Sequence, residues 1–190
     1  RSDSLGAVLP RILRPSDNQA AESLLRTVGR VEGDEGSTEE GLQVLEETLT
    51  GWGVEPGAVR LADGSGLSRY DEVTPAALVR VLRTMWRSPH HEILRRALPA
   101  PEEWGTLRGR FEGTPAVAAL RAKTGSLSSV RGLAGYVEDG DGETLIFALL
   151  IQGYDAPGGT ATALRDLLVE QLSLFHRRVD PGWPEYRDGG

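Results

Sequence analysis

With 190 residues, of which 39% are hydrophobic, the chain is long enough for one domain, or a piece of one, with a single core. A net charge of −7 and an isoelectric point near 5.1 argue against a phosphate-binding surface, so we expect no nucleic-acid partner. Cysteine is absent, which excludes disulfides, thiolate catalysis and cysteine metal sites.

The first half of the chain has the apolar spacing of helices. From Ser16 to Val28 apolar residues recur three and four positions apart, which predicts a helix capped by Ser16 and ended by Gly29. The same spacing over residues 38–50 predicts a second helix, which Gly51-Trp52-Gly53 would end.

A short strand and a tight loop are predicted next. Residues 59–61 favour a strand, and the closely spaced glycines of residues 63–69 favour a tight loop. Thr74-Pro75 places a capping residue before a proline, so a third helix is expected to begin there. Residues 90–98 predict a further short helix, and residues 104–114 an irregular segment.

The second half of the chain changes to the pattern of strands. Residues 117–124, 130–138 and 143–152 are rich in apolar and β-favouring residues, and Asp139-Gly140-Asp141-Gly142 is a hairpin signal between the last two. A C-terminal helix is predicted over residues 160–178. The apolar stripe that we expect to cover one face of the sheet comprises Leu164, Leu167, Leu168, Leu172 and Phe175.

These elements predict an α/β fold in which the three late strands form an antiparallel sheet flanked by helices. Lys123 is expected near the end of the edge strand. We expect one structural unit over residues 1–180 and a tail over residues 181–190.

Two short motifs carry the chemical signal. The only lysine of the chain stands in Lys123-Thr124-Gly125, and Ser16-Asp17-Asn18 lies far upstream at the start of a predicted helix. Ser-x-x-Lys, Ser-Asp-Asn and Lys-Thr-Gly together mark class A β-lactamases and penicillin-binding proteins. The first of these is missing, because the residue three before Lys123 is Leu120. The acylated serine of that mechanism is therefore not expected within these residues.

Together with the glycine-rich loop 63–69 and the following Val73-Thr74-Pro75, these motifs resemble the S13 family of D-alanyl-D-alanine carboxypeptidases and endopeptidases, typified by penicillin-binding protein 4. The resemblance runs from about residue 10 to residue 176. It covers the later half of the family's transpeptidase domain, a fold shared with β-lactamases. The part with Ser-x-x-Lys has no counterpart here, so the resemblance implies an N-terminal segment elsewhere that supplies the nucleophile.

The Ser-Asp-Asn motif has a structural and a chemical interpretation. Ser16 alone is equally well explained as a helix cap. The resemblance implies that its hydroxyl relays a proton to the leaving amine. Asn18 is either a solvated polar residue or, as its family counterpart, a hydrogen-bond partner of the substrate backbone. Asp17 is expected to point away from the site.

The Lys-Thr-Gly strand is the expected substrate edge. A surface lysine is the ordinary interpretation of Lys123. Arginine, however, supplies the other 20 of the 21 lysine and arginine side chains, which weakens that interpretation. The resemblance implies that Lys123 polarises the Ser16 hydroxyl and attracts the terminal carboxylate of the substrate. Substrate-binding residues implied on the same strand are Thr124, Gly125, Ser126 and Leu127. The backbone N–H of Ser126 would form half of an oxyanion hole.

Two further residues are implied in substrate binding. Loop 63–69 is explained equally well as a simple turn, but in relatives that process peptidoglycan the residues matching Ser65 and Arg69 face the pocket. Arg69 would then bind the carboxylate of a diaminopimelate side chain. The three histidines have no spacing suited to a metal, and residues 139–143 are interpreted as a turn rather than a calcium loop. No metal or cofactor is expected.

Three functions remain open at this point. The chain is the C-terminal catalytic segment of an S13-like serine DD-peptidase, a β-lactamase segment, or a non-catalytic binding module of the same fold. For the first, the expected partners are the N-terminal segment with Ser-x-x-Lys, peptidoglycan peptides and β-lactams. The location implied is extracytoplasmic. The first residues lack a signal-peptide core, so the signal sequence is expected outside this chain.

Overall fold

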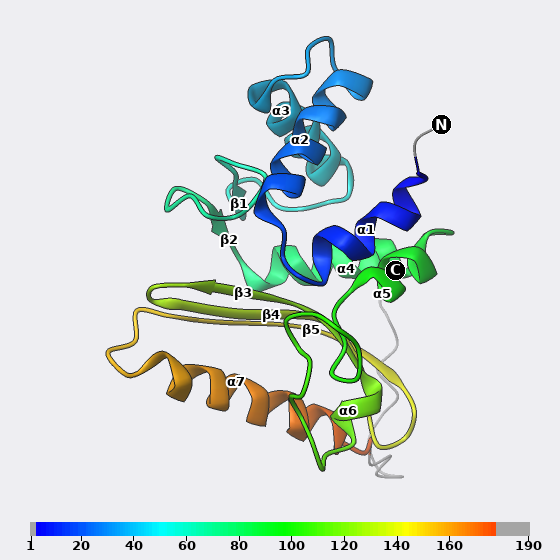
Figure 1. Cartoon of the computed structure of the whole chain (residues 1–190), viewed down its shortest axis with the longest axis vertical. Coiled ribbons are helices and arrows are strands. Elements are labelled where there is room, and N and C mark those ends of the chain that lie inside the picture. Colours follow the sequence, from blue (N-terminus) through cyan, green and yellow to red (C-terminus); the bar gives the residue numbers. More distant parts are fainter. Residues whose placement is uncertain (1–2, 178–190) are drawn as a thin grey trace, which may run out of the picture.

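The computed structural model describes residues 3–177 and confirms the predicted α/β architecture (Figure 1). A sheet lies between a group of helices on one face and a single long helix on the other. The elements in chain order are α1 (Leu5–Leu13), α2 (Asn18–Glu32), α3 (Thr38–Gly51), β1 (Val59–Arg60), β2 (Glu72–Val73), α4 (Pro75–Trp86), α5 (His91–Ala97), α6 (Ala116–Ala119), β3 (Leu120–Leu127), β4 (Val130–Glu138), β5 (Thr144–Gln152) and α7 (Gly158–Ser173). The predicted tail over residues 181–190 lies outside the described residues.

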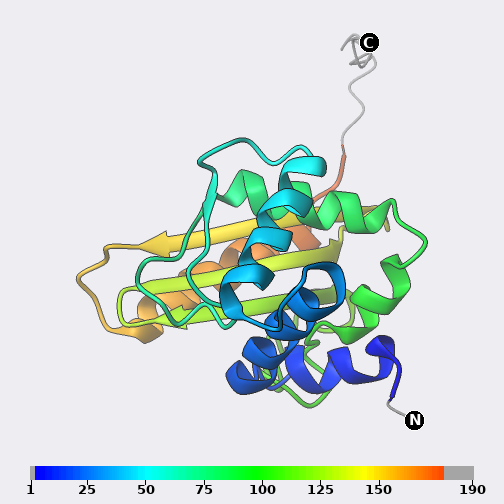
Figure 2. The ribbon, with the colours of Figure 1, turned by 90° about the horizontal axis from the view of Figure 1, so that it is seen from above.

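The main sheet is antiparallel with the order β3-β4-β5, and β3 forms one edge as predicted. Seen from above, α2 lies over the β3 side of the sheet and α4 over the β5 side (Figure 2). In the register, Lys123 pairs with Ala134 and Gly125 with Gly132. The strand predicted over residues 117–124 begins later, because the residues before Leu120 form the short helix α6. It also continues to Leu127, which pairs with Val130.

The main core lies between the sheet and α7. Its buried members include Leu107, Phe111, Leu120, Leu133, Val137 and Val169. A smaller cluster on the other face joins Leu82, Leu98 and Tyr136, and the Tyr136 hydroxyl donates a hydrogen bond to the Leu82 carbonyl at 2.9 Å. The sheet is therefore covered on both faces.

The prediction for the packing face of α7 was wrong for most of its residues, although Leu172 packs against the main core as predicted. The residues buried against the sheet are Ala161, Arg165, Val169 and Ser173. Leu164, Leu167 and Leu168 are 49%, 51% and 42% exposed. The helix is apolar on two faces, and periodicity alone favoured the larger side chains. The Gly132 carbonyl accepts a hydrogen bond from Arg165 at 2.8 Å, which permits the burial of this arginine.

The start and end of α2 also differ from the prediction. Asp17 caps the helix, because its carboxylate accepts the Ala20 N–H at 2.9 Å. The helix continues beyond Gly29 to Glu32. Gly29 does not end it but permits close contact with α3, since a Cβ there would lie 2.8 Å from the backbone nitrogen of Gly41.

The remaining helix predictions are confirmed. α3 follows the predicted range to within one residue, α4 begins at Pro75 after the cap Thr74, and α5 lies inside residues 90–98. The predicted strand at Val59 pairs antiparallel with β2, a two-residue strand that periodicity could not indicate. Within residues 3–177, no helix is both long and apolar enough to cross a membrane.

Candidate active site

Ser16 lies at the junction of α1 and α2, in the left-handed conformation with φ 61°. The following N–H, of Asp17, donates to the Ile12 carbonyl at 2.9 Å. This is the closure of a Schellman motif, in which the left-handed position usually carries glycine. Ser16 therefore ends α1 and does not cap α2, and its side chain remains available for other contacts.

Lys123 reaches Ser16 across the edge of the sheet. Its Nζ donates to the Ser16 Oγ at 2.8 Å and to the Thr124 carbonyl at 2.7 Å. Burial lowers the pKa of Lys123 to about 8. Within the described part of the chain no carboxylate pairs with this ammonium group. The predicted proximity of the two motifs is thus observed.

A cavity of about 550 Å³ surrounds this contact. Of the predicted residues, it is lined by Ser16, Asn18, Ser65, Lys123, Thr124, Gly125, Ser126 and Leu127. Asp17, expected to point away, does not line it. Arg69 is exposed and does not line it either, so its contact with substrate stays a prediction. The structure therefore brings the two motifs and the first part of loop 63–69 to one place.

Carboxylates hold the loop that contains Ser65. Asp63 accepts the N–H groups of Gly66 and Ser68 at 2.5 and 2.8 Å, and Glu22 accepts that of Ser65 at 2.9 Å. Burial opposes the charge of Asp63, but these N–H groups keep its pKa below the ordinary value. Burial and the charge of Asp63 raise the pKa of the neighbouring Asp71. These hydrogen bonds fix the conformation of the loop and so position Ser65 at the cavity.

Thr106 is a cavity residue that the sequence did not reveal. Its hydroxyl lies 2.8 Å from that of Thr124, and its N–H donates to the Arg14 carbonyl at 3.0 Å. Arg14 in turn pairs with Glu103 at 2.5 Å. The irregular segment 104–114 is thus attached both to the strand of Lys123 and to the chain just before Ser16.

Arg110, from the same irregular segment, and Arg165, from α7, also line the cavity. Neither belongs to a motif, and only the fold brings them to the Lys-Thr-Gly strand. Arg110 binds Asp166 of α7 through two of its nitrogens. The α7 side of the cavity is therefore cationic.

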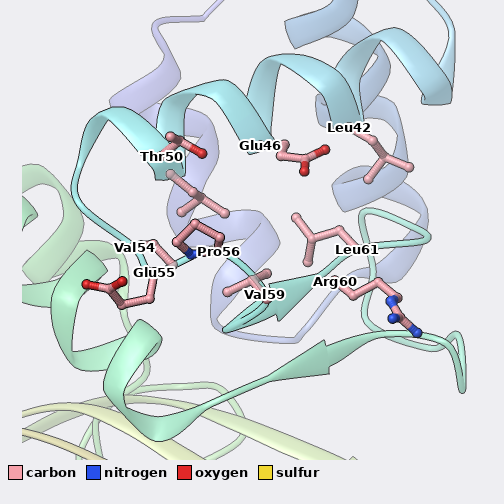
Figure 3. Close-up of a pocket in the computed structure, with 11 residues that line it drawn as sticks. Leu42, Glu46, Thr50, Val54, Glu55, Pro56, Val59, Arg60 and Leu61 are labelled. Carbon is pink, nitrogen blue, oxygen red and sulfur yellow. The ribbon is translucent and has the colours of Figure 1, made fainter.

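A second hollow of about 290 Å³ lies between α3 and β1 (Figure 3). Leucine, valine and proline side chains line much of it, together with the charged Glu46, Glu55 and Arg60. It contains neither of the two motifs. Its lining lacks the paired lysine and hydroxyl of the first cavity, and we assign no reaction to it.

Comparison with known proteins agrees with this geometry. The model of the D-Ala-D-Ala carboxypeptidase 3 (S13) family matches residues 1–171. The D-alanyl-D-alanine carboxypeptidase of Actinomadura sp. (strain R39) is 34% identical, over 92% of this chain and 33% of the relative. DacB of Haemophilus influenzae is 35% identical, over 80% of this chain and 33% of the relative. The chain thus spans about a third of the length of these curated relatives.

The solved structures show the same likeness. Penicillin-binding protein 4 of Haemophilus influenzae superimposes with a TM-score of 0.80 and 30% identity, covering 89% of this chain and 40% of that one. A class A β-lactamase from Bacteroides cellulosilyticus, 18% identical with a TM-score of 0.62, shares the fold.

Proposed function

The chain belongs to the D-Ala-D-Ala carboxypeptidase 3 (S13) family, and we propose that it forms the Lys-Thr-Gly half of the active site of a serine DD-peptidase. The observation that carries this proposal is the 2.8 Å hydrogen bond between Lys123 and Ser16, whose positions are 107 residues apart. The proposed substrates are peptidoglycan peptides ending in D-Ala-D-Ala, or their cross-links, and β-lactams acylate the same enzyme. The location proposed is extracytoplasmic.

The geometry supports a proton relay through Ser16. Because the ammonium group of Lys123 donates to the Ser16 oxygen, the hydroxyl proton of Ser16 is directed elsewhere, towards the cavity. From there it can protonate the nitrogen of the leaving amino acid as the scissile bond breaks. The general base of the complete site has by then accepted the hydroxyl proton of the nucleophilic serine. Ser16 regains its own proton from that base. Lys123 keeps the oxygen oriented throughout.

The other lining residues suit substrate binding. Lys123 and the Thr124 hydroxyl line the cavity from opposite faces of β3 and would flank the terminal carboxylate. The Ser126 N–H would donate to the oxyanion of the tetrahedral intermediate. Asn18, at the first position of α2, lines the cavity and would bind the substrate backbone. Gly125 and Leu127 continue the edge along which the peptide would lie, with Ser65 opposite.

The nucleophile comes, in this proposal, from a segment outside these residues that carries Ser-x-x-Lys. Lys123 is the only lysine here, and the residue three before it is leucine. The relatives are about three times as long. One of the similar structures, penicillin-binding protein 4 of Haemophilus influenzae, was determined in complex with a β-lactam.

Intact-mass spectrometry with benzylpenicillin tests the proposal. This chain alone should gain no adduct, whereas the chain together with the Ser-x-x-Lys segment should gain one acyl group, on a serine outside these residues. Lys123→Ala in the complete enzyme should slow acylation, and the exposed Arg108→Ala serves as a control of similar size. An adduct on any serine of this chain, or a complete enzyme that is never acylated, would contradict the proposal.

A further inference from the structure

Arg110 presents an unused hydrogen-bonding edge near the Lys-Thr-Gly strand. Its Nε donates to Asp166 Oδ2 at 3.0 Å, and its Nη2 pairs with Oδ1 of the same carboxylate. This two-point contact fixes the plane of the guanidinium group. The third nitrogen, Nη1, has no hydrogen-bond partner within residues 3–177. The side chain lines the cavity and is only 21% exposed.

The positive charge beside this cavity is not balanced. Asp166 is shared with Arg165, whose Nε lies 3.4 Å from Oδ1 and whose side chain is 2% exposed. Two guanidinium groups therefore depend on one carboxylate. Burial first, and then the charges of Arg110 and Arg131, lower the pKa of Arg165, an effect that Asp166 opposes. An anion in the cavity would supply the missing charge.

Arg110 lines the same cavity as Thr124, where the proposed substrate would place its terminal carboxylate. Along β3 alternate side chains share a face, and buried Ala122 packs in the core with Val169 of α7. Thr124 is therefore on the α7 face, and Lys123 is on the opposite one. Thr106, whose hydroxyl contacts that of Thr124, belongs to the same irregular segment as Arg110, and both residues line the cavity. Arg110 thus approaches the Thr124 position from the side that Lys123 does not reach.

Lys123 alone offers little to a carboxylate. Two of its three N–H groups are engaged by Ser16 and the Thr124 carbonyl. A carboxylate has about four acceptor sites on its two oxygens. Further donors are needed, and the two N–H groups on Arg110 Nη1 are fixed and unused.

We propose that Arg110 is a specificity-determining residue that binds the free α-carboxylate of the leaving amino acid, opposite Lys123. This inference rests on the proposed DD-peptidase function and identifies the chemical group that the site requires. Arg110 selects peptides that end in a carboxylate over the same peptides ending in a neutral group. The carboxylate of benzylpenicillin occupies the same place during acylation. Asp166 is a positioning residue, since it orients the guanidinium group.

The test uses the complete enzyme and compares charged with neutral ligands. The specificity constant is measured for an N-acyl-D-Ala-D-Ala peptide and for its C-terminal amide, and the acylation rate for benzylpenicillin and its methyl ester. Arg110→Gln should lower both values for the carboxylate forms by about ten- to hundredfold, because a charge-assisted hydrogen bond is lost. Values for the neutral forms should change less than about threefold.

Two further variants separate binding from structure. Arg110→Lys should restore part of the preference for the carboxylate forms, because it retains the positive charge. Arg108→Gln, an exposed arginine two residues away, should leave every value unchanged. Equal losses on charged and neutral ligands for Arg110→Gln would show that the residue only holds the structure together, and would overturn the inference. A wild-type enzyme without hydrolysis or acylation would instead refute the proposed function on which the inference rests.

Discussion

Ser16 combines a strained backbone with a side chain that contacts Lys123. A non-glycine residue at φ 61° costs about 1 kcal/mol or more, because its Cβ approaches the neighbouring carbonyl. The strain is consistent with a hydroxyl that is retained for its contact with Lys123. Position 16 therefore allows stability and chemistry to be separated by mutation.

Ser16→Gly and Ser16→Ala should differ in stability but not in activity. Both remove the hydroxyl, so each should lower the acylation rate by roughly 10² to 10⁴. Glycine also removes the Cβ strain, so Ser16→Gly should be more stable than Ser16→Ala by about 1 kcal/mol. Urea unfolding of the two variants of the complete enzyme measures the difference. Equal free energies of unfolding would show that the left-handed conformation carries no strain.

The buried charge of Lys123 is predicted to lower the free energy of unfolding of the protein. Its pKa falls from 10.5 to about 8 through burial, so the folded state binds this proton less tightly than the unfolded state. The free energy of unfolding should therefore rise as the pH increases from 8 towards 10.5, and the full cost should be present below pH 8. Lys123→Met should remove this rise and stabilise the protein at pH 7 by about 2 to 3 kcal/mol, with loss of activity.

Unfolding curves between pH 7 and 9.5 for wild type and Lys123→Met provide the measurement. The upper limit of pH 9.5 keeps the titration of Tyr136 out of the measurement. Burial raises the pKa of Tyr136 from 10.0 to about 12, so this residue lowers the free energy of unfolding only as the pH rises above 10. Parallel pH profiles for the two proteins would contradict the assignment of the rise to Lys123.

At the residue scale the sequence predicted the motifs better than their surroundings. The resemblance of Lys-Thr-Gly and the distant Ser-Asp-Asn to the family's motifs was sufficient to predict that Ser16 and Lys123 lie together. The capping role of Ser16 was wrong, because a chain reversal before a helix has the same polar residues as a simple cap. Thr106 and Arg110 had no local signal, since only long-range contacts bring their segment to β3.

Two glycines in α3 show how an element depends on its neighbour. A Cβ on Gly41 would overlap the Leu25 carbonyl of α2, whereas a Cβ on Gly51 would have no atom within 4 Å. The two helices therefore depend on Gly41 for their close approach. Gly51, at the end of the helix, has no such constraint.

Alanine at the two positions should have opposite effects. Gly41→Ala should destabilise the protein by about 2 kcal/mol or more, because packed backbone must move. Gly51→Ala should stabilise it by up to about 1 kcal/mol, because alanine loses less conformational entropy in a helix. Thermal unfolding of both variants is the measurement. A neutral Gly41→Ala would mean that α2 and α3 separate at little cost.

At the scale of helices and strands, the sequence predicted where an element lies in the chain better than which of its faces is buried. The range of β4 agreed with the prediction because residues 130–138 are bounded by turn residues on both sides. The face of α7 did not, because Leu164 and Leu168 have the same spacing as a buried stripe. Which of two apolar faces is buried depends on the shape of the sheet, and a one-dimensional pattern does not contain that information.

For the whole molecule, the exposed leucines of α7 are the surface to explain. Leu164, Leu167 and Leu168 form an apolar face next to the described sheet, in which β5 pairs with β4 alone. Such a face normally marks an interaction site. The proposed segment with Ser-x-x-Lys is expected to cover it, in a contact larger than the roughly 2,000 Å² at which obligate interfaces begin.

Coexpression of the two pieces should therefore give one stable complex, while this chain alone should self-associate in light scattering. Leu164→Lys with Leu168→Lys should prevent the complex from forming. Gln43→Lys with Glu47→Lys adds lysines at the same spacing on the exposed polar side of α3 and should not. A monodisperse, cooperatively melting chain without a partner would contradict the expectation, as would a complex that tolerates the first pair of substitutions.

The hydrogen bond between Lys123 and Ser16 also bears on folding kinetics. It closes a loop of 107 positions, so we expect it to form late in folding, after the helical part and the sheet have docked. Elements joined by such distant contacts can open as separate units below the global melting temperature. On heating, activity should then disappear before the sheet melts, and hydrogen exchange should be faster at the α1–α2 junction than in β4.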